Sequence, residues 1–146
     1  MKTLVVYDSA YGNTEKVAKA IGDAIAGDVK VVRASDADIA DVNAVDLLIV
    51  GSPTYGGKGT QAVLDFLAKV PEGGIKGKKV AAFDTRLTGR FVKVFGFAAE
   101  KIAESLKAKG GDLASTSEGF FVKGKKGPLN DGELERAASW AKDIAK

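Results

Sequence analysis

The stretch that decides the fold is residues 4–15, which read Leu-Val-Val-Tyr-Asp-Ser-Ala-Tyr-Gly-Asn-Thr-Glu. Its first four residues are apolar, which predicts a short buried strand. Polar and small residues follow at 8–13. A helix is predicted from Thr14, because apolar residues recur at helical spacing up to Ile25 and Gly27 then stops the pattern. A strand, a short polar loop and a helix in this order are typical of the units that build parallel sheets.

The same alternation continues to the end of the chain. Further strands are predicted at 29–32, 45–50, 79–83 and within 113–122, the last one irregular around Ser117. Further helices are predicted at 61–70, at 91–109 and from an N-cap at Asp131 to Ile144, and residues 35–42 could hold a short one. Five strands that alternate with helices indicate one α/β domain over residues 1–146, a three-layer sandwich around a doubly wound parallel sheet.

Composition narrows the chemistry available to the chain. The 146 residues include no cysteine and no histidine, which excludes disulfides, thiolate and imidazole metal sites, cysteine catalysis and a Ser-His-Asp triad. The formal net charge is +3, and it is uneven: residues 1–75 carry 7 basic and 10 acidic side chains, residues 76–146 carry 15 and 9. No targeting segment or membrane-spanning stretch is recognised, so we expect a cytoplasmic protein with no membrane partner.

Three loops are candidates for a ligand site, because ligands of doubly wound folds bind beyond the carboxyl ends of the strands. They are residues 8–13, 51–59 and 84–90. The first leads into a helix N-terminus, whose free backbone N–H groups attract phosphate. Ser9, Asn13 and Thr14 add neutral hydrogen-bonding groups, and Gly12 allows close approach of the backbone. The alternative is an ordinary strand–helix turn in which the same residues act as caps.

The second loop, Gly51-Ser52-Pro53-Thr54-Tyr55-Gly56-Gly57, places an aromatic ring at the same edge. Tyr55 could stack on a flat ligand, and the two glycines that follow leave the peptide free to change orientation. A loop with an incidental tyrosine is the alternative. The sequence lacks the GxGxxG pattern of nicotinamide-binding domains. Its near match to the Walker pattern has one residue too many, so nucleotide hydrolysis is disfavoured.

These two loops carry a resemblance. The segments Ser9-Ala10-Tyr11-Gly12-Asn13-Thr14-Glu15 and Gly51-Ser52-Pro53-Thr54-Tyr55-Gly56 resemble the phosphate loop and the first flavin loop of the flavodoxin family. The chain's length matches short-chain flavodoxins, and both loops are also similar to the flavodoxin modules of diiron flavoproteins. The resemblance implies a flavodoxin-like five-stranded sheet in order 2-1-3-4-5, noncovalently bound flavin mononucleotide (FMN), and electron transfer between redox partner proteins.

The resemblance also implies which residues hold the FMN. In an electron carrier of this kind, no protein side chain is needed as catalytic acid, base or nucleophile, and the resemblance implies no metal. Gly56 matches the family residue whose carbonyl can turn toward the flavin ring. The cofactor-binding residues are expected in three groups: Ser9, Ala10, Tyr11, Gly12, Asn13 and Thr14; Ser52, Pro53, Thr54, Tyr55, Gly56 and Gly57; and Asp84, Thr85, Arg86 and Leu87.

The chain departs from the family pattern in three respects. Tyr11 stands where a hydroxyl residue is usual, so it could reshape or shield the phosphate site. The segment 84–90 has no aromatic residue to cover the outer face of the flavin, for which Phe91 is only a weak candidate. Flavodoxins are usually acidic, whereas this chain is basic. We therefore expect Arg86 and Arg90 to attract the anionic reduced flavin, making it less destabilised than in a typical flavodoxin, and a solvated loop is the alternative for both arginines.

Two other functions remain open at this point. An enzyme that takes hydride from a nicotinamide to reduce a quinone or flavin would use an open flavin face, and a flavin-free interaction protein would explain Tyr11. The turn Lys123-Gly-Lys-Lys-Gly-Pro128 is interpreted as a solvated loop, with a contact for an acidic redox partner as the alternative. It is too short and too poor in aromatic residues to indicate nucleic-acid binding. A monomer is expected.

Overall fold

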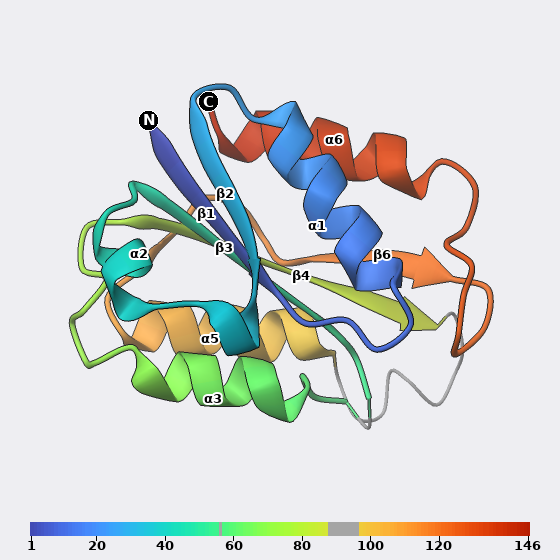
Figure 1. Cartoon of the computed structure of the whole chain (residues 1–146), viewed down its shortest axis with the longest axis horizontal. Coiled ribbons are helices and arrows are strands. Elements are labelled where there is room, and N and C mark those ends of the chain that lie inside the picture. Colours follow the sequence, from blue (N-terminus) through green and yellow to red (C-terminus); the bar gives the residue numbers. More distant parts are fainter. Residues whose placement is uncertain (56, 88–96) are drawn as a thin grey trace.

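The computed structural model describes residues 1–55, 57–87 and 97–146. Strands and helices alternate as the sequence predicts (Figure 1). The strands are β1 (Lys2–Tyr7), β2 (Asp28–Arg33), β3 (Leu47–Pro53), β4 (Lys79–Leu87), β5 (Asp112–Leu113) and β6 (Glu118–Val122). The helices are α1 (Asn13–Ala24), a 3₁₀ turn (Ala34–Asp36), α2 (Ile39–Asn43), α3 (Gln61–Lys69), α5 (Ala98–Ala108) and α6 (Glu133–Ile144).

The sheet is parallel throughout and has the order β2-β1-β3-β4-β5, which confirms the predicted order. The fifth position is shared by two short strands. β5 pairs with the beginning of β4 and β6 pairs with its end, where Asp84 lies opposite Gly119 and Leu87 opposite Val122. The predicted irregularity around Ser117 falls in the segment between these two strands. β6 alone of the two therefore supports the carboxyl end of β4.

Helices cover both faces of the sheet. α1 and α6 lie on one face, and α2, α3 and α5 lie on the other (Figure 1). Fully buried residues of β1, β3 and β4 alternate between two apolar clusters, one under each helical layer. On the α1/α6 side, the rings of Phe83, Phe120 and Trp140 meet edge to face with centroids 6.0–6.2 Å apart. Trp140 of α6 therefore packs against the sheet.

The structure corrects two predicted boundaries. Residues 84–87, expected in a loop, continue β4, because β6 supplies a partner strand along them. The last helix begins at Glu133 after Gly132, whose φ of 83° turns the chain into the helix without a side-chain cap, so Asp131 is not the N-cap. The helix predicted over 91–109 begins at Ala98 within the described residues, and residues 91–96 lie outside them.

Candidate functional site

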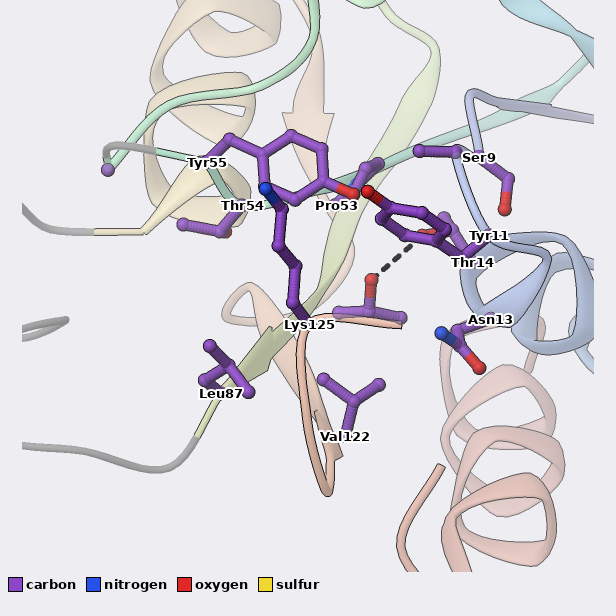
Figure 2. A pocket seen from close by; sticks show the side chains of 13 residues that line it. Ser9, Tyr11, Asn13, Thr14, Pro53, Thr54, Tyr55, Leu87, Val122 and Lys125 are labelled. Carbon is purple, nitrogen blue, oxygen red and sulfur yellow. Dashed lines mark hydrogen bonds between the residues drawn. The ribbon is translucent and has the colours of Figure 1, made fainter. Parts of the chain in front are cut away.

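A cavity of about 580 Å³ opens at the carboxyl edge of the sheet. Figure 2 shows its walls, which come from the loops after β1 and β3, the end of β4 and the turn after β6. Its volume lies in the range of small-molecule and cofactor sites. The described residues that line it are Ser9, Ala10, Tyr11, Asn13, Thr14, Pro53, Thr54, Tyr55, Gly57, Thr85, Leu87, Val122 and Lys125.

The loop after β1 places the N-terminus of α1 at this cavity. Gly12 adopts a φ of 93°, and its N–H donates to Ser9 Oγ at 3.0 Å. The N–H of Lys16 donates to the Gly12 carbonyl at 3.1 Å, which closes the first turn. The preceding N–H groups of the helix have no acceptor within it, as at any helix N-terminus. The hydroxyls of Thr14 and Thr85 lie 2.8 Å apart in a buried hydrogen bond, which ties this turn to the end of β4 (Figure 2).

A polar cluster behind the loop holds it in place. Arg33, at the end of β2, donates to the carbonyl of Ser9 at 3.2 Å and lies 3.6 Å from the Asp8 carboxylate. Arg33 also pairs with Glu15 at 3.3 Å, and the Tyr7 hydroxyl donates to Glu15 at 2.8 Å. The hydrogen bond from Tyr7 holds the pKa of Glu15 below its usual range, with smaller contributions from Lys19 and Arg33. The charge of Arg33 is therefore paired with the carboxylates of Asp8 and Glu15 behind the loop.

The loop after β3 presents Tyr55. The N–H groups of Tyr55 and Lys58 donate to each other's carbonyls at 3.0 and 3.2 Å, and Gly57 between them has a φ of 78°. The Thr54 N–H donates to the Thr85 carbonyl at 3.0 Å, which fixes the loop to β4. Burial raises the pKa of the Tyr55 phenol, and the nearby Tyr11 and Asp8 raise it further. The loop therefore fixes the ring of Tyr55 in the cavity wall, and the phenol is neutral.

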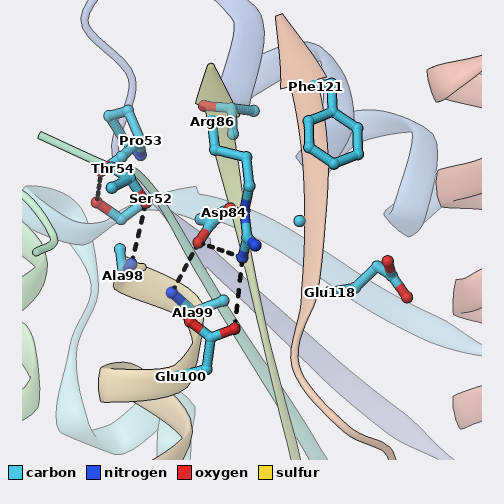
Figure 3. Close-up of polar contacts among 12 residues, drawn as sticks. Ser52, Pro53, Thr54, Asp84, Arg86, Ala98, Ala99, Glu100, Glu118 and Phe121 are labelled. Carbon is cyan, nitrogen blue, oxygen red and sulfur yellow. Dashed lines mark hydrogen bonds and ion pairs between the residues drawn. The ribbon is translucent and has the colours of Figure 1, made fainter. Parts of the chain in front are cut away.

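Asp84 and Arg86 bind each other on the side of β4 that faces away from the cavity (Figure 3). Arg86 makes two hydrogen bonds to the Asp84 carboxylate, at 2.7 and 2.8 Å, and stacks on the Phe97 ring at 3.5 Å from its centroid. Asp84 is fully buried and also accepts the Ala99 N–H at 2.9 Å, while Thr54 Oγ1 accepts the Ala98 N–H at 3.0 Å. These two side chains cap α5 from outside the helix. The structure thus contradicts the expectation that the Arg86 guanidinium attracts the flavin, because Asp84 neutralises it away from the cavity.

Most of the predicted site residues meet at the cavity. The exceptions among the described residues are Gly12, Ser52, Asp84 and Arg86, which do not line it. Ser52 is fully buried, donates to the Pro53 carbonyl at 2.8 Å and accepts the Thr60 N–H at 3.0 Å, so it shapes the loop from beneath. Gly56, Arg90 and Phe91 lie outside the described residues.

Sequence reasoning missed two lining residues, Val122 and Lys125. Val122 ends β6, and Lys125 lies in the basic turn that follows it, for which the sequence favours a solvated loop. The turn lies against the start of α1, since a Cβ added to Gly127 would come within 2.5 Å of Asn13 Oδ1. The only signal in the sequence was the run of lysines, and it is the parallel pairing of β6 with the end of β4 that brings the run to the cavity.

Comparisons with known proteins agree with this geometry. The flavodoxin family model matches residues 5–140. A flavodoxin of Maridesulfovibrio salexigens is 29% identical over 154 residues, covering 99% of this chain and 97% of its own. The structure of oxidised flavodoxin 2 from Bacillus cereus superposes with a TM-score of 0.83 at 26% identity, covering 99% and 98%. An archaeal flavodoxin superposes with a TM-score of 0.82 at 27% identity, covering 99% and 96%.

Proposed function

Since the chain belongs to the flavodoxin family, whose members bind FMN and transfer electrons to redox partners, we propose that the cavity at the carboxyl edge of its sheet holds the FMN. The comparisons favour this electron carrier over a nicotinamide-dependent reductase or a flavin-free interaction protein. The observation that carries the proposal is that one cavity brings together the N-terminus of α1 and the ring of Tyr55.

The donors of this cavity fit the two ends of FMN. The unpaired N–H groups at the start of α1 suit the phosphate, with the side chains of Ser9, Asn13 and Thr14 beside them. Tyr55 offers a flat apolar surface to the flavin ring, and Pro53, Thr54, Thr85 and Leu87 complete its surroundings. The backbone of Ser52, Gly56, Asp84 and Arg86 stays a predicted contact. When bound, FMN supplies the redox chemistry, and the chain's own residues bind it, orient it and shield it from water.

We further infer that the redox partner presents an acidic surface. Lys58, Lys123, Lys125 and Lys126 are all exposed. Lys125 lines the cavity, Lys126 lies beside the ring of Tyr11 in the cavity wall, and the backbone of Lys58 is paired with that of Tyr55. Such a rim steers an acidic partner toward the flavin. We expect the carrier to act as a monomer in the cytoplasm, and light scattering on the purified flavoprotein tests the first of these two expectations.

Titration of the flavin-free protein with FMN and with riboflavin, which lacks the phosphate, tests the proposed site. Because the α1 amides bind the phosphate, we expect riboflavin to bind at least about tenfold more weakly, a difference of about 1.4 kcal/mol. Asn13→Ala weakens FMN several-fold and leaves riboflavin unchanged, and Asn43→Ala, at the far end of α2, serves as its matched control. Equal affinities for the two flavins would show that the phosphate is not bound at the start of α1. Absence of FMN binding would show that the cavity is not an FMN site.

A further inference from the structure

The turn after β6 brings a positive charge into the cavity. Lys125 is the only side chain with a full charge at neutral pH among the described residues that line it. Figure 2 shows its side chain crossing the cavity with the ammonium group directed toward Tyr55. We propose that Lys125 is the residue that stabilises the anionic, fully reduced flavin ring in this protein. The inference rests on the proposed function, in which this cavity holds FMN.

The turn is built to hold this lysine in place. The Lys123 N–H donates to the Pro128 carbonyl and the Gly127 N–H to the Gly124 carbonyl, both at 2.9 Å, so the turn is closed at two levels. Gly127, with a φ of 97°, lies against Asn13, where no side chain would fit. The neighbouring Lys126 places its ammonium 5.9 Å from the centroid of the Tyr11 ring. The residues that follow Lys125 therefore pack against the loop that carries Ser9–Thr14, and the hydrogen bonds within the turn fix the backbone that precedes it.

The direction of Lys125 assigns it to the flavin ring and not to the phosphate. The phosphate end of the cavity is defined by the start of α1, and the ring end by Tyr55. Lys126 stands on the Tyr11 side, whereas Lys125 reaches toward Tyr55. Tyr11, in the position where the family usually has a hydroxyl residue, thus provides a surface for the basic turn.

The chemistry makes the charge of Lys125 selective for one redox state. Oxidised flavin accepts two electrons from a redox partner and one proton from solvent, and the product carries one negative charge on the ring. An ammonium group beside the ring lowers the energy of this anion and leaves the neutral oxidised ring nearly unaffected. The reduced form is then bound more tightly than it would be without the lysine. Arg86 and Asp8 do not compete for this role, because Arg86 is paired with Asp84, and Asp8 with Arg33.

The experiment compares Lys125→Met with Lys123→Met, which removes the same charge from the same turn outside the cavity. The midpoint potential of bound FMN is measured by reductive titration, and the affinity for oxidised FMN and for riboflavin by fluorescence. We expect Lys125→Met to weaken reduced FMN about tenfold relative to oxidised FMN, which lowers the two-electron midpoint by about 30 mV. Lys125→Arg restores the potential, and Lys123→Met leaves it close to that of the unaltered protein.

Three results would overturn the inference. One is an unchanged potential in Lys125→Met with FMN bound. Another is a loss of FMN affinity that spares riboflavin and leaves the potential unaltered, which would make Lys125 a phosphate ligand. The third is an equal fall in potential for Lys123→Met, which would make the effect one of general surface charge. Failure of the unaltered protein to bind FMN would overturn the proposed function itself, and is recognised before any variant is made.

Discussion

Tyr55 is the residue on which binding of the flavin ring depends most. Its backbone is closed in a tight turn with Lys58, and burial keeps its phenol neutral. Removing the ring in Tyr55→Ala exposes one face of the flavin to water, so we expect FMN affinity to fall by about 1–3 kcal/mol. Tyr55→Phe retains the stacking surface and should bind FMN within a few tenths of a kcal/mol of the unaltered protein. Equal affinities for Tyr55→Ala and Tyr55→Phe in a fluorescence titration would remove Tyr55 from the site.

Asp84 is the buried charge on which the end of β4 depends. It accepts hydrogen bonds from Arg86 and from the Ala99 N–H, and its side chain has no exposed surface. Asp84→Asn leaves the guanidinium with only the more exposed Glu100 carboxylate, 3.7 Å away, as counter-charge, so we expect a loss of about 3–5 kcal/mol in the free energy of unfolding. The double variant Asp84→Asn with Arg86→Met, which removes both charges, should recover part of that loss. Urea denaturation measures both, and a single variant as stable as the unaltered protein would contradict the structural role.

The residues that the sequence could and could not predict differ in where their partners come from. Ser9, Asn13, Thr14 and Tyr55, which the sequence predicts as cofactor-binding residues, all line the cavity, and each belongs to a local pattern at the end of a strand. Arg86 was expected to attract the flavin because residues 84–90 were expected to form a loop at the same edge, whereas β4 continues to Leu87 and Arg86 pairs with Asp84. Lys125 was missed because no local pattern links it to residues more than a hundred positions earlier. Contacts made by the tertiary fold alone carry no signal in a single sequence.

At the scale of elements, α6 protects the exposed edge of β6. Glu133 accepts the Phe121 N–H at 2.7 Å, so a backbone donor on the edge strand is satisfied by a side chain. Arg136 holds that carboxylate at 2.7 Å, pairs with Glu118 at 2.6 Å and lies over the Phe120 ring at 4.6 Å. The helix and the strand are therefore joined by charge as well as by packing.

This junction predicts a pH dependence of stability. The hydrogen bond from Arg136 lowers the pKa of Glu133, with the Phe121 N–H adding to the effect. The stabilisation is therefore complete above the unfolded-state pKa of about 4.3 and is lost as the pH falls through the lower folded-state value. We expect Glu133→Gln to be less stable by about 1–3 kcal/mol at pH 7, with the difference shrinking below about pH 4.

Unfolding in urea at several pH values measures this difference. Glu135→Gln, an exposed residue on the same helix, is the matched control and should show no such dependence. A gap between Glu133→Gln and the unaltered protein that stays constant from pH 7 to pH 3 would contradict the assignment to Glu133.

The elements themselves were predicted well because their apolar periodicity is strong. β1, β3 and α1 lie within a few residues of their predicted positions, since each buries a complete face or stripe. The errors fall at boundaries decided by neighbours. β4 continues to Leu87 because β6 pairs with it, and α6 starts after Gly132 without using Asp131. The split of the last strand position into β5 and β6 was visible only as a local irregularity around Ser117.

At the scale of the whole molecule, the chain carries a net positive charge, whereas its family resemblance leads us to expect an acidic protein. The net charge of +3 arises in the C-terminal half, and the fold places part of that excess at the mouth of the cavity through the turn after β6. Each such lysine is exposed, so none contributes much to stability. Together they set the sign of the potential that an approaching partner meets.

This sign predicts how electron transfer responds to salt. An anionic oxidant such as ferricyanide is attracted to the basic rim, so its reaction with the reduced flavoprotein should slow as ionic strength rises from about 0.01 to 0.5 M, where the Debye length falls below 10 Å. A cationic oxidant of similar potential should react faster as salt is added. Lys58→Glu combined with Lys126→Glu should reverse both trends, and stopped-flow mixing at fixed pH measures them. Because all rates are compared on the same bound flavin, an anionic oxidant that reacts equally fast at every ionic strength would show that the lysines do not face the route by which electrons leave the protein.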